Sequence, residues 1–144
     1  MINTISSNII QFMFGGNATF TIDCGVNHFA YKIRRKSTDD DSKIYWCLLV
    51  ERNKNTYCGY FKINGNRLTF RHSNRHGITY SDERIQTLLN AIHKRGNLPD
   101  GITIRHVGRC ACCGRILTDS KSNELGFGPE CWKKIRVYVQ KDEV

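Results

Sequence analysis

The sequence predicts an α+β fold in two parts. Residues 1–99 are expected to form a basic, β-rich domain, an antiparallel meander of about five strands with a covering helix over residues 81–95. Residues 100–144 are expected to form a small treble-clef-like metal-binding module that ends in a helix. Three observations lead to this prediction: apolar and polar residues alternate over the first part, one stretch has helical periodicity, and three cysteines near the end have metal-ligand spacing.

The first 14 residues admit two interpretations. Their apolar side chains recur at near-helical spacing, and Gly15-Gly16 would end such a helix, but an extended arm fits equally well. In either form we expect the segment to pack on its own domain, the usual fate of an amphipathic stretch. The apolar residues are Ile2, Ile5, Ile9, Phe12 and Met13.

The strands are predicted from alternation with a period of two. Apolar residues recur at every second position over 18–22 and over 29–33, with a turn near Cys24-Gly25. Residues 44–50 are apolar on both faces, as expected of a central strand. Asn64-Gly65 predicts a tight hairpin of the primed type, because both residues tolerate positive φ.

The helix after the strands has clear boundaries. Ser81 precedes two acidic residues in the first turn, and Lys94 and Arg95 lie in the last turn before Gly96 ends the helix. One apolar stripe is expected to cover a face of the sheet: Ile85, Leu88, Leu89 and Ile92. A short strand at residues 102–104 follows, and the final helix is expected to have an inner face made of Trp132, Ile135 and Val139.

Cysteines near the end of the chain indicate a zinc site. Cys110 and Cys113 form a Cys-x-x-Cys turn, and Gly114 can adopt the positive φ that turns backbone N–H groups toward thiolates. Pro129 suits the first position of a helix, so Cys131 falls in a first turn whose N–H groups favour a thiolate. A zinc knuckle facing a helix N-terminus is a treble-clef-like arrangement.

A structural zinc ion takes four ligands, so one is still needed. We expect His106, with three residues between it and Cys110, to complete the site. Cys112 is the reserve ligand. Adjacent residues point in different directions, so we do not expect Cys112 and Cys113 to bind the same ion. Cys110 with Cys112 could replace the chosen pair, but Gly114 would then lie one residue too late. Other histidines remain possible as the fourth ligand, but no motif in the neighbouring sequence supports them: His28, His72, His76 and His93.

The residues of this region resemble a known family. The run from His106 through Thr118, then Ser122, then Gly126-x-Gly128-Pro129-x-Cys131, is similar to a small zinc domain of uncharacterised function found in bacteriophages, plasmids and actinobacteria. The resemblance covers roughly residues 100–135. It implies His106, Cys110, Cys113 and Cys131 as zinc ligands and a setting in a mobile genetic element such as a bacteriophage, with no established reaction or partner. Cys112 departs from the family pattern.

The net charge of +9 lies mostly at the front of the chain. Residues 1–99 hold fourteen basic and seven acidic side chains, whereas residues 100–144 hold eight and six. The front domain is therefore the part expected to bind a polyanion, and the zinc is expected to be structural.

Nucleic-acid binding is the first functional hypothesis. Residues 52–81 hold six basic and no acidic side chains, interleaved with Tyr57, Tyr60, Phe61 and Phe70, and such a sheet suits a single strand. The candidate binding residues are Lys32, Arg34, Arg35, Lys62, Arg67, Arg71 and Arg75, with Arg52 and Lys54 in the same run.

Two other functions compete with this one. A non-enzymatic inhibitor could bind a host protein or nucleoprotein complex, for example as an anti-defence protein of the anti-CRISPR type, because positive charge suits an acidic surface. A zinc enzyme is the least favoured, since the deaminase pattern is absent and Glu130 is the only carboxylate next to a proposed ligand.

The sequence also predicts the cellular setting. It contains no signal-peptide pattern and no apolar run of about 20 residues, so we expect a cytoplasmic protein of a bacterial host without a membrane partner. Cys24, Cys47 and Cys58 are then expected to be reduced, buried thiols. The acidic run at residues 39–41 is expected to be a solvated turn rather than a cation site.

Overall fold

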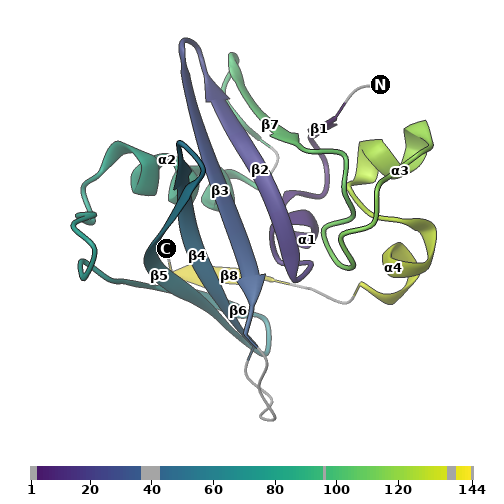
Figure 1. The fold of residues 1–144 in the computed structure, drawn as a ribbon. Helices are drawn as coiled ribbons and strands as arrows, with labels where there is room; N and C mark the ends of the chain where they lie inside the picture. The colour runs from purple at the N-terminus through teal and green to yellow at the C-terminus, as the bar shows by residue number, and fades with distance from the viewer. Residues whose placement is uncertain (1–2, 37–42, 96, 136–138, 144) are drawn as a thin grey trace.

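The computed structural model describes residues 3–36, 43–95, 97–135 and 139–143, and its described residues form one mixed sheet with four helices (Figure 1). The order of the strands across the sheet is β1-β7-β2-β3-β4-β5-β6-β8. The strands are β1 (Thr4–Ile5), β2 (Asn17–Cys24), β3 (Asn27–Arg35), β4 (Lys43–Glu51), β5 (Lys54–Asn64), β6 (Arg67–His72), β7 (Ile102–His106) and β8 (Lys141–Glu143). The helices are α1 (Ile9–Met13), α2 (Glu83–Lys94), α3 (Ser120–Leu125) and α4 (Pro129–Lys134).

Strands β2 to β6 form an antiparallel meander, each pairing with the next along the chain. The predicted meander of about five strands is thereby confirmed, and the alternation that predicted it appears as alternating burial along β2 and β4. The sheet is nevertheless larger than predicted. β1 and β7 extend it antiparallel at one edge, and β8 extends it parallel at the other.

Two tight turns of the meander depend on residues with positive φ. Between β4 and β5, Arg52 and Asn53 both have positive φ, 50° and 64°, as a type I′ turn requires, although neither is glycine. Between β5 and β6 the central residues are Gly65 and Asn66, and only Gly65 has positive φ. The predicted tight hairpin of the primed type is present one residue further along, because Asn64 pairs with Arg67 as the last residue of β5 and Gly65, the first central residue, has the positive φ of a type II′ turn.

The segment after residue 99 is joined to the front sheet at both ends. β7 pairs with β1 and β2, and β8 pairs with β6, so the predicted boundary at residues 99 and 100 falls within one continuous sheet. The prediction of a terminal helix reaching Val139 was also wrong. α4 ends at Lys134, Ile135 turns to an extended conformation with ψ 125°, and the described chain ends in β8.

Helix α2 has the predicted stripe and slightly different ends. Its N-cap is Asp82, whose carboxylate accepts a hydrogen bond from the Arg84 N–H at 2.9 Å, rather than Ser81. At its C-terminus Arg95 takes the left-handed conformation, with φ 52°. Gly96, predicted to end the helix, lies outside the described residues, as does the acidic run at 39–41.

The N-terminal segment contains both forms that the sequence left open. β1 is a two-residue strand on β7, and α1 is a single-turn helix with four buried residues: Ile9, Ile10, Phe12 and Met13. Their burial agrees with the expectation that this segment packs on its own chain.

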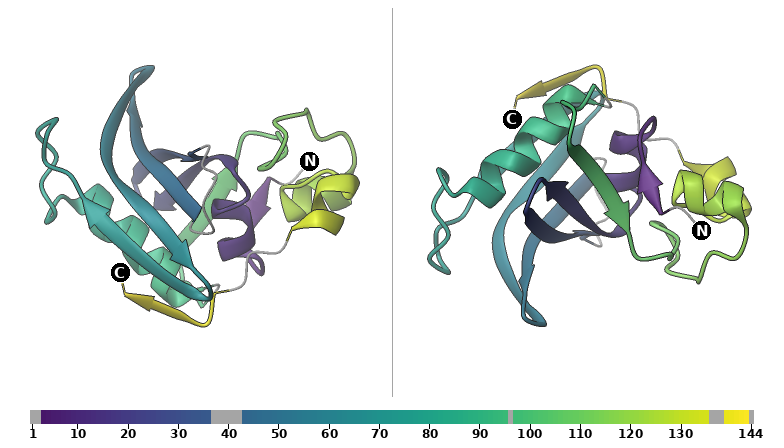
Figure 2. Two further views of the ribbon diagram at one scale, coloured as in Figure 1. Left: turned by 90° about the horizontal axis from the view of Figure 1, so that it is seen from below. Right: turned by 90° about the horizontal axis from the view of Figure 1, so that it is seen from above.

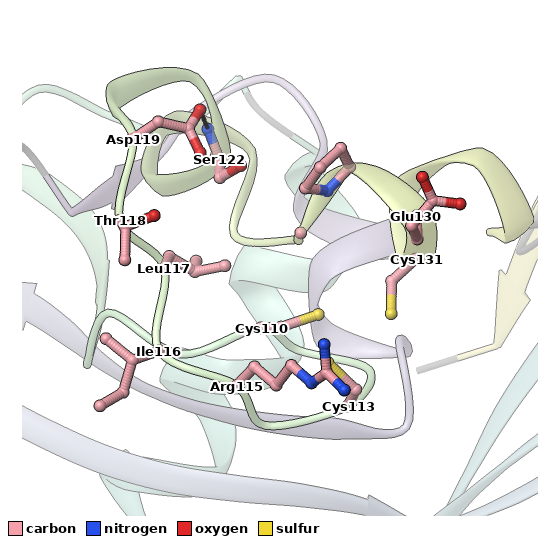
Figure 3. Close-up of a pocket in the computed structure, with 12 residues that line it drawn as sticks. Cys110, Cys113, Arg115, Ile116, Leu117, Thr118, Asp119, Ser122, Glu130 and Cys131 are labelled. Atoms are coloured by element: carbon pink, nitrogen blue, oxygen red, sulfur yellow. Dashed lines mark hydrogen bonds between the residues drawn. The ribbon is translucent and has the colours of Figure 1, made fainter.

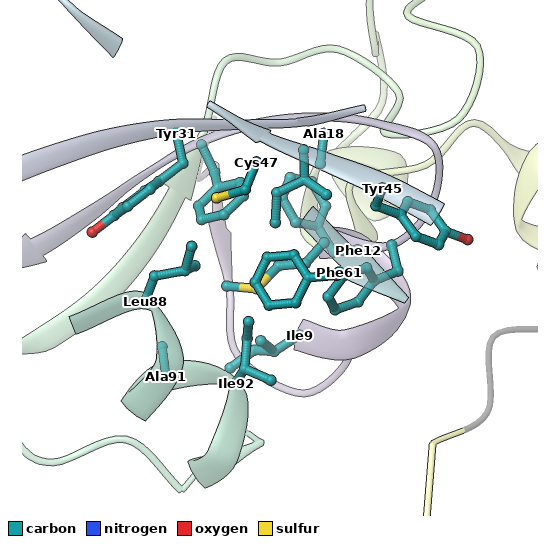
Figure 4. Close-up of a cluster of buried hydrophobic side chains, with 14 of the residues drawn as sticks. Ile9, Phe12, Ala18, Tyr31, Tyr45, Cys47, Phe61, Leu88, Ala91 and Ile92 are labelled. Atoms are coloured by element: carbon teal, nitrogen blue, oxygen red, sulfur yellow. The ribbon is translucent and has the colours of Figure 1, made fainter. Parts of the chain in front are cut away.

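The core lies on one side of the sheet, where α1 and α2 pack (Figure 2). Figure 4 shows Leu88, Ala91 and Ile92 of α2 facing Phe61 and Tyr31 of the sheet. At this inner face Cys47 and Cys58 are fully buried free thiols, 3.4 Å apart at a β-bulge, whereas Cys24 is only partly buried. The described part of the chain has no helix whose length and apolar character would let it cross a membrane.

Candidate metal centre and basic face

Three cysteines from two distant segments meet at one point. The ligand atoms of Cys110, Cys113 and Cys131 all lie within 4.8 Å of one another, and Figure 3 shows their sulfurs turned toward a common centre. A tetrahedral zinc ion with bonds of about 2.3 Å would place its sulfur ligands roughly 3.8 Å apart, so small side-chain adjustments would suffice. Within the described residues this is the only such group of three or more metal-ligating side chains.

The turn that carries the first two cysteines has the geometry of a zinc knuckle. The Cys110 N–H donates to the carbonyl of Arg115 at 2.8 Å, and the Gly114 N–H donates back to the carbonyl of Cys110 at 3.0 Å. Gly114 has φ +80°, which confirms the conformational role predicted for it. The Cys112 N–H points at the sulfur of Cys110, at 3.4 Å.

The third cysteine lies on α4 as predicted. Gly128 is the N-cap with extended φ −67° and ψ 158°, Pro129 begins the helix, and Cys131 falls in the first turn. Glu130, the carboxylate beside it, is exposed, turns away from the sulfurs in Figure 3 and lies 3.7 Å from Lys133.

The environment of the sulfurs favours loss of a proton at one of them. Burial alone would raise the pKa of Cys110, but three backbone N–H groups and the neighbouring Cys113 thiol outweigh it, so this pKa lies below its usual value. The N–H groups are those of Cys113, Gly128 and Cys112. Burial, followed by contacts with the other thiols, raises the pKa of Cys131 to about 12. A cation binding here would therefore displace protons, as zinc does at thiol sites.

His106 does not join this cluster. Its Nε2 lies 2.6 Å from the carbonyl oxygen of Asn123, and its Nδ1 accepts the N–H of Gly108 at 2.9 Å. Both ring nitrogens are thus bonded to backbone groups, and the side chain is 4% exposed against Phe12. His106, predicted as the fourth ligand, is thus a core side chain at the end of β7 in this structure and lies outside the group of three cysteines.

Buried polar residues around His106 connect the N-terminal segment to the cysteine region, a role that sequence reasoning missed. The His106 N–H donates to the carbonyl of Asn3 at 2.8 Å, and Asn8 donates to the carbonyl of Leu125 at 2.8 Å. Asn123, 2% exposed, donates to two carbonyls in the loop before α3. No local pattern marks these asparagines, since their partners lie far away in the sequence or in an irregular loop.

Cys112, the reserve ligand, lies beside the cluster. Its side chain is exposed, and its thiol contacts that of Cys131. A pocket of about 450 Å³ opens at the same place, with the three clustered cysteines in its wall. Its polar lining includes Arg115, Thr118, Asp119, Ser122 and Glu130.

The other surface of interest is the outer face, defined as the side of the β2–β6 meander away from α1 and α2. Residues paired directly across neighbouring strands project to the same face, so the register identifies its members. One row crosses four strands, as Arg34 pairs with Trp46, Trp46 with Tyr60, and Tyr60 with Arg71. Two further rows flank it: Lys32, Leu48 and Tyr57 on one side, and Ile44, Lys62 and Thr69 on the other.

Most of the predicted binding residues share this face, but not all. Lys32, Arg34, Lys62, Arg67 and Arg71 have its register, and Arg75 lies in the following loop near Tyr57. Arg35 is exposed, but it pairs with the buried Tyr45 and so has the register of the inner face. Phe61 and Phe70 also belong inside, where their rings lie 4.7 Å apart.

Trp46 is the centre of the outer face, and sequence reasoning did not assign it there. Its ring meets those of Tyr57 and Tyr60 edge-on, with centroids 5.7 and 6.2 Å away. The Lys36 Nζ lies 5.3 Å from its centroid, a cation–π distance. His76 contacts Tyr57 from the loop after β6. The alternation over 44–50 placed Trp46 and Tyr45 on different faces of the strand. It did not show which of the two faces is buried in the core.

Two charged groups on this side of the sheet are held by neighbours. The Arg34 guanidinium donates to the Ala18 carbonyl and to the Thr19 hydroxyl, and its burial lowers its pKa. Asp23, near the far end of β2, accepts two hydrogen bonds from Arg105 at 2.8 and 2.9 Å, which hold the pKa of that carboxyl well below its usual range. The acidic group on this side is thereby paired.

Comparison with known proteins gives one match. Residues 103–136, from β7 to just beyond α4, match the model of a family of unknown function (DUF6011). No curated protein and no solved structure matches the chain. This part of the chain is therefore similar to a family of unknown function, and the matched segment contains the cysteine cluster of this chain.

Proposed function

We propose that this protein binds nucleic acid through its outer face and that a zinc ion on the cysteine cluster stabilises the region after β7. The observation that carries the proposal is the row Arg34–Trp46–Tyr60–Arg71, in which basic and aromatic side chains occupy one line across four strands. Exposed cations such as Arg71 contact phosphates and exposed aromatic rings contact bases, whereas Arg34 is held by Ala18 and Thr19.

The charge around that row supports a polyanionic partner. Lys32 and Lys62 lie in the two flanking rows, and Lys36 lies over Trp46. Strands are about 4.8 Å apart, so these groups form a compact basic surface rather than scattered charges. A basic sheet face attracts phosphate groups that lie within about one Debye length, because salt screens its positive charge at longer distances.

The zinc site is a separate part of the proposal. Cys110, Cys113 and Cys131 would supply three ligands, and Cys112, whose thiol contacts that of Cys131, would complete the set after a change of rotamer. Figure 1 shows α3 and α4 on the opposite side of the molecule from β5 and β6. The ion would thus stabilise the fold at a distance from the basic surface.

Fluorescence anisotropy with labelled oligonucleotides, repeated across salt concentrations, tests the binding. We expect log K to fall linearly with log salt, and the double variant K62A/R71A to reduce the slope by about two. The matched control is K94A/K121A, which removes the same charge from exposed positions on α2 and α3. An affinity that does not change with salt concentration would refute the proposed surface. Equal losses of affinity in both double variants would refute it as well. Failure of every oligonucleotide to bind would favour the inhibitor of a host protein instead.

Elemental analysis and cobalt substitution test the metal. We expect one zinc per chain and, in the cobalt-loaded protein, thiolate-to-metal charge-transfer absorption that falls by about a quarter in C112S, as one of four thiolates is lost. The control is C24S, a cysteine in β2 outside the cluster. Unchanged absorption in C112S would mean that a group other than Cys112 fills the fourth position.

A further inference from the structure

We infer that the ligand of the outer face is a single-stranded nucleic acid, whose unpaired bases stack on Trp46, Tyr57 and Tyr60. The inference rests on the proposed function and names the class of ligand. These three rings form one cluster on neighbouring strands, at the middle of the basic surface.

The first argument is the contrast with the protein's core aromatics. Phe14 also meets Tyr45 and Phe61 edge-on, at 5.2 Å in each case, but these three rings are at most 1% exposed. Trp46, Tyr57 and Tyr60 adopt the same edge-on geometry and remain partly exposed. Their packing orders the rings without burying them.

The second argument is the orientation of these rings. Trp46 makes angles of 73° with Tyr57 and 82° with Tyr60, so neither tyrosine stacks on Trp46. An edge-on contact covers at most one face of one ring in the pair, so other π-faces stay open, and a π-face is what an unpaired base stacks on. Lys36 already lies over one face of Trp46, a position from which it could meet the phosphate beside a stacked base.

The third argument concerns duplexes. Bases in a duplex are stacked on each other, and a protein reads them with a helix or a β-ribbon inserted into a groove. In the described structure α2, the longest helix, packs on the inner face, and the outer face is a sheet surface. Such a surface can reach the phosphates of a duplex but not its bases, so a single strand gains contacts that a duplex lacks.

Tryptophan fluorescence and anisotropy test the inference together. The chain has two tryptophans, so the variant W132F leaves Trp46 as the only reporter. We expect quenching of Trp46 when single-stranded DNA or RNA of one sequence is added, and weaker binding of the matching duplex. The parallel DNA and RNA arms show whether the strand's sugar matters.

Substitutions of the tyrosine rings measure how much each ring contributes to the affinity for a single strand. Y60A and Y57A should each weaken single-strand binding by about 5- to 150-fold, the range for loss of one base–aromatic stack, while Y60F and Y57F should retain most of the affinity. Circular dichroism and thermal unfolding identify any variant that fails to fold, and W46F, which keeps a ring, then tests the central position.

The outcomes separate this inference from the proposed function. If K62A/R71A weakens binding while the tyrosine variants do not, or if the duplex binds as tightly as the single strand, the inference is wrong and the proposed function stands. If no oligonucleotide binds the wild-type protein, both are wrong. Quenching by the single strand together with selective loss in Y57A and Y60A supports both.

Discussion

Replacement of His106 by alanine distinguishes a core residue from a metal ligand. The imidazole satisfies the carbonyl of Asn123 at 2.6 Å and the N–H of Gly108 at 2.9 Å, and alanine would leave both without this partner. An unsatisfied buried polar group costs about 1–3 kcal/mol. Gly108 is only partly buried, so water can replace one partner, and we expect H106A to lose about 2–4 kcal/mol of unfolding free energy.

Urea unfolding of the metal-loaded protein measures that loss. The matched control is H93A, an exposed histidine on α2, which should change the free energy of unfolding by less than about 0.5 kcal/mol. A second measurement separates stability from ligation. The zinc content of folded H106A and its cobalt absorption spectrum should equal those of the wild type.

Two results would refute the reasoning. If H106A folds but loses its zinc, or if its cobalt spectrum shifts, the imidazole is a ligand and the hydrogen bonds to Asn123 and Gly108 describe only the metal-free state. If H106A is as stable as the wild type, the two backbone bonds contribute nothing measurable.

Three further predictions follow from named contacts. Gly126 has φ +79°, and an added Cβ would lie 2.4 Å from the ring of Phe12, so G126A should cost about 2–4 kcal/mol in urea unfolding; a loss below about 0.5 kcal/mol contradicts the clash. Burial lowers the pKa of His106, partly opposed by its bond to a carbonyl, so the native state binds fewer protons than the unfolded state below about pH 6.5. Its contribution to stability should be complete above that pH and fall as the pH drops toward the folded pKa, by at most about 1.4 kcal/mol per pH unit, and a wild-type slope equal to that of H106A would exclude it. In R105A the pKa of Asp23, measured by NMR titration, should rise toward its ordinary value, whereas no rise would assign the shift to other neighbours.

The parts of the fold that depend on local patterns were predictable. Alternation gave the meander, and the spacing around Gly114 and Pro129 gave the cysteine cluster, because a turn and a helix N-terminus are built from neighbouring residues. The stripe of α2 was equally visible, since its period of 3.6 persists over three turns.

The parts that depend on distant contacts were not predictable from one sequence. Alternation cannot state which face of β4 is buried, so Trp46 and Phe61 were placed only by the assembled sheet. The position of the His106 ring depends on its contact with the carbonyl of Asn123 in α3, which is distant in the sequence. The apolar period over 132–139 suggested a helix to Val139, but α4 ends at Lys134, and residues 141–143 pair with β6, a strand far away in the sequence.

The anchoring of β7 and β8 in one sheet has a consequence for the metal-free protein. The segment that carries the cysteines lies between β7 and β8, so both of its ends are fixed in the sheet and it is not a separate terminal domain. Loss of the ion would loosen the interior of that segment, while the pairing of β7 with β2 and of β8 with β6 would still tether its ends. Chelation should then disorder the segment that carries the cysteines and leave the outer face unchanged. The metal content of the chain and the affinity proposed for its outer face should therefore vary independently.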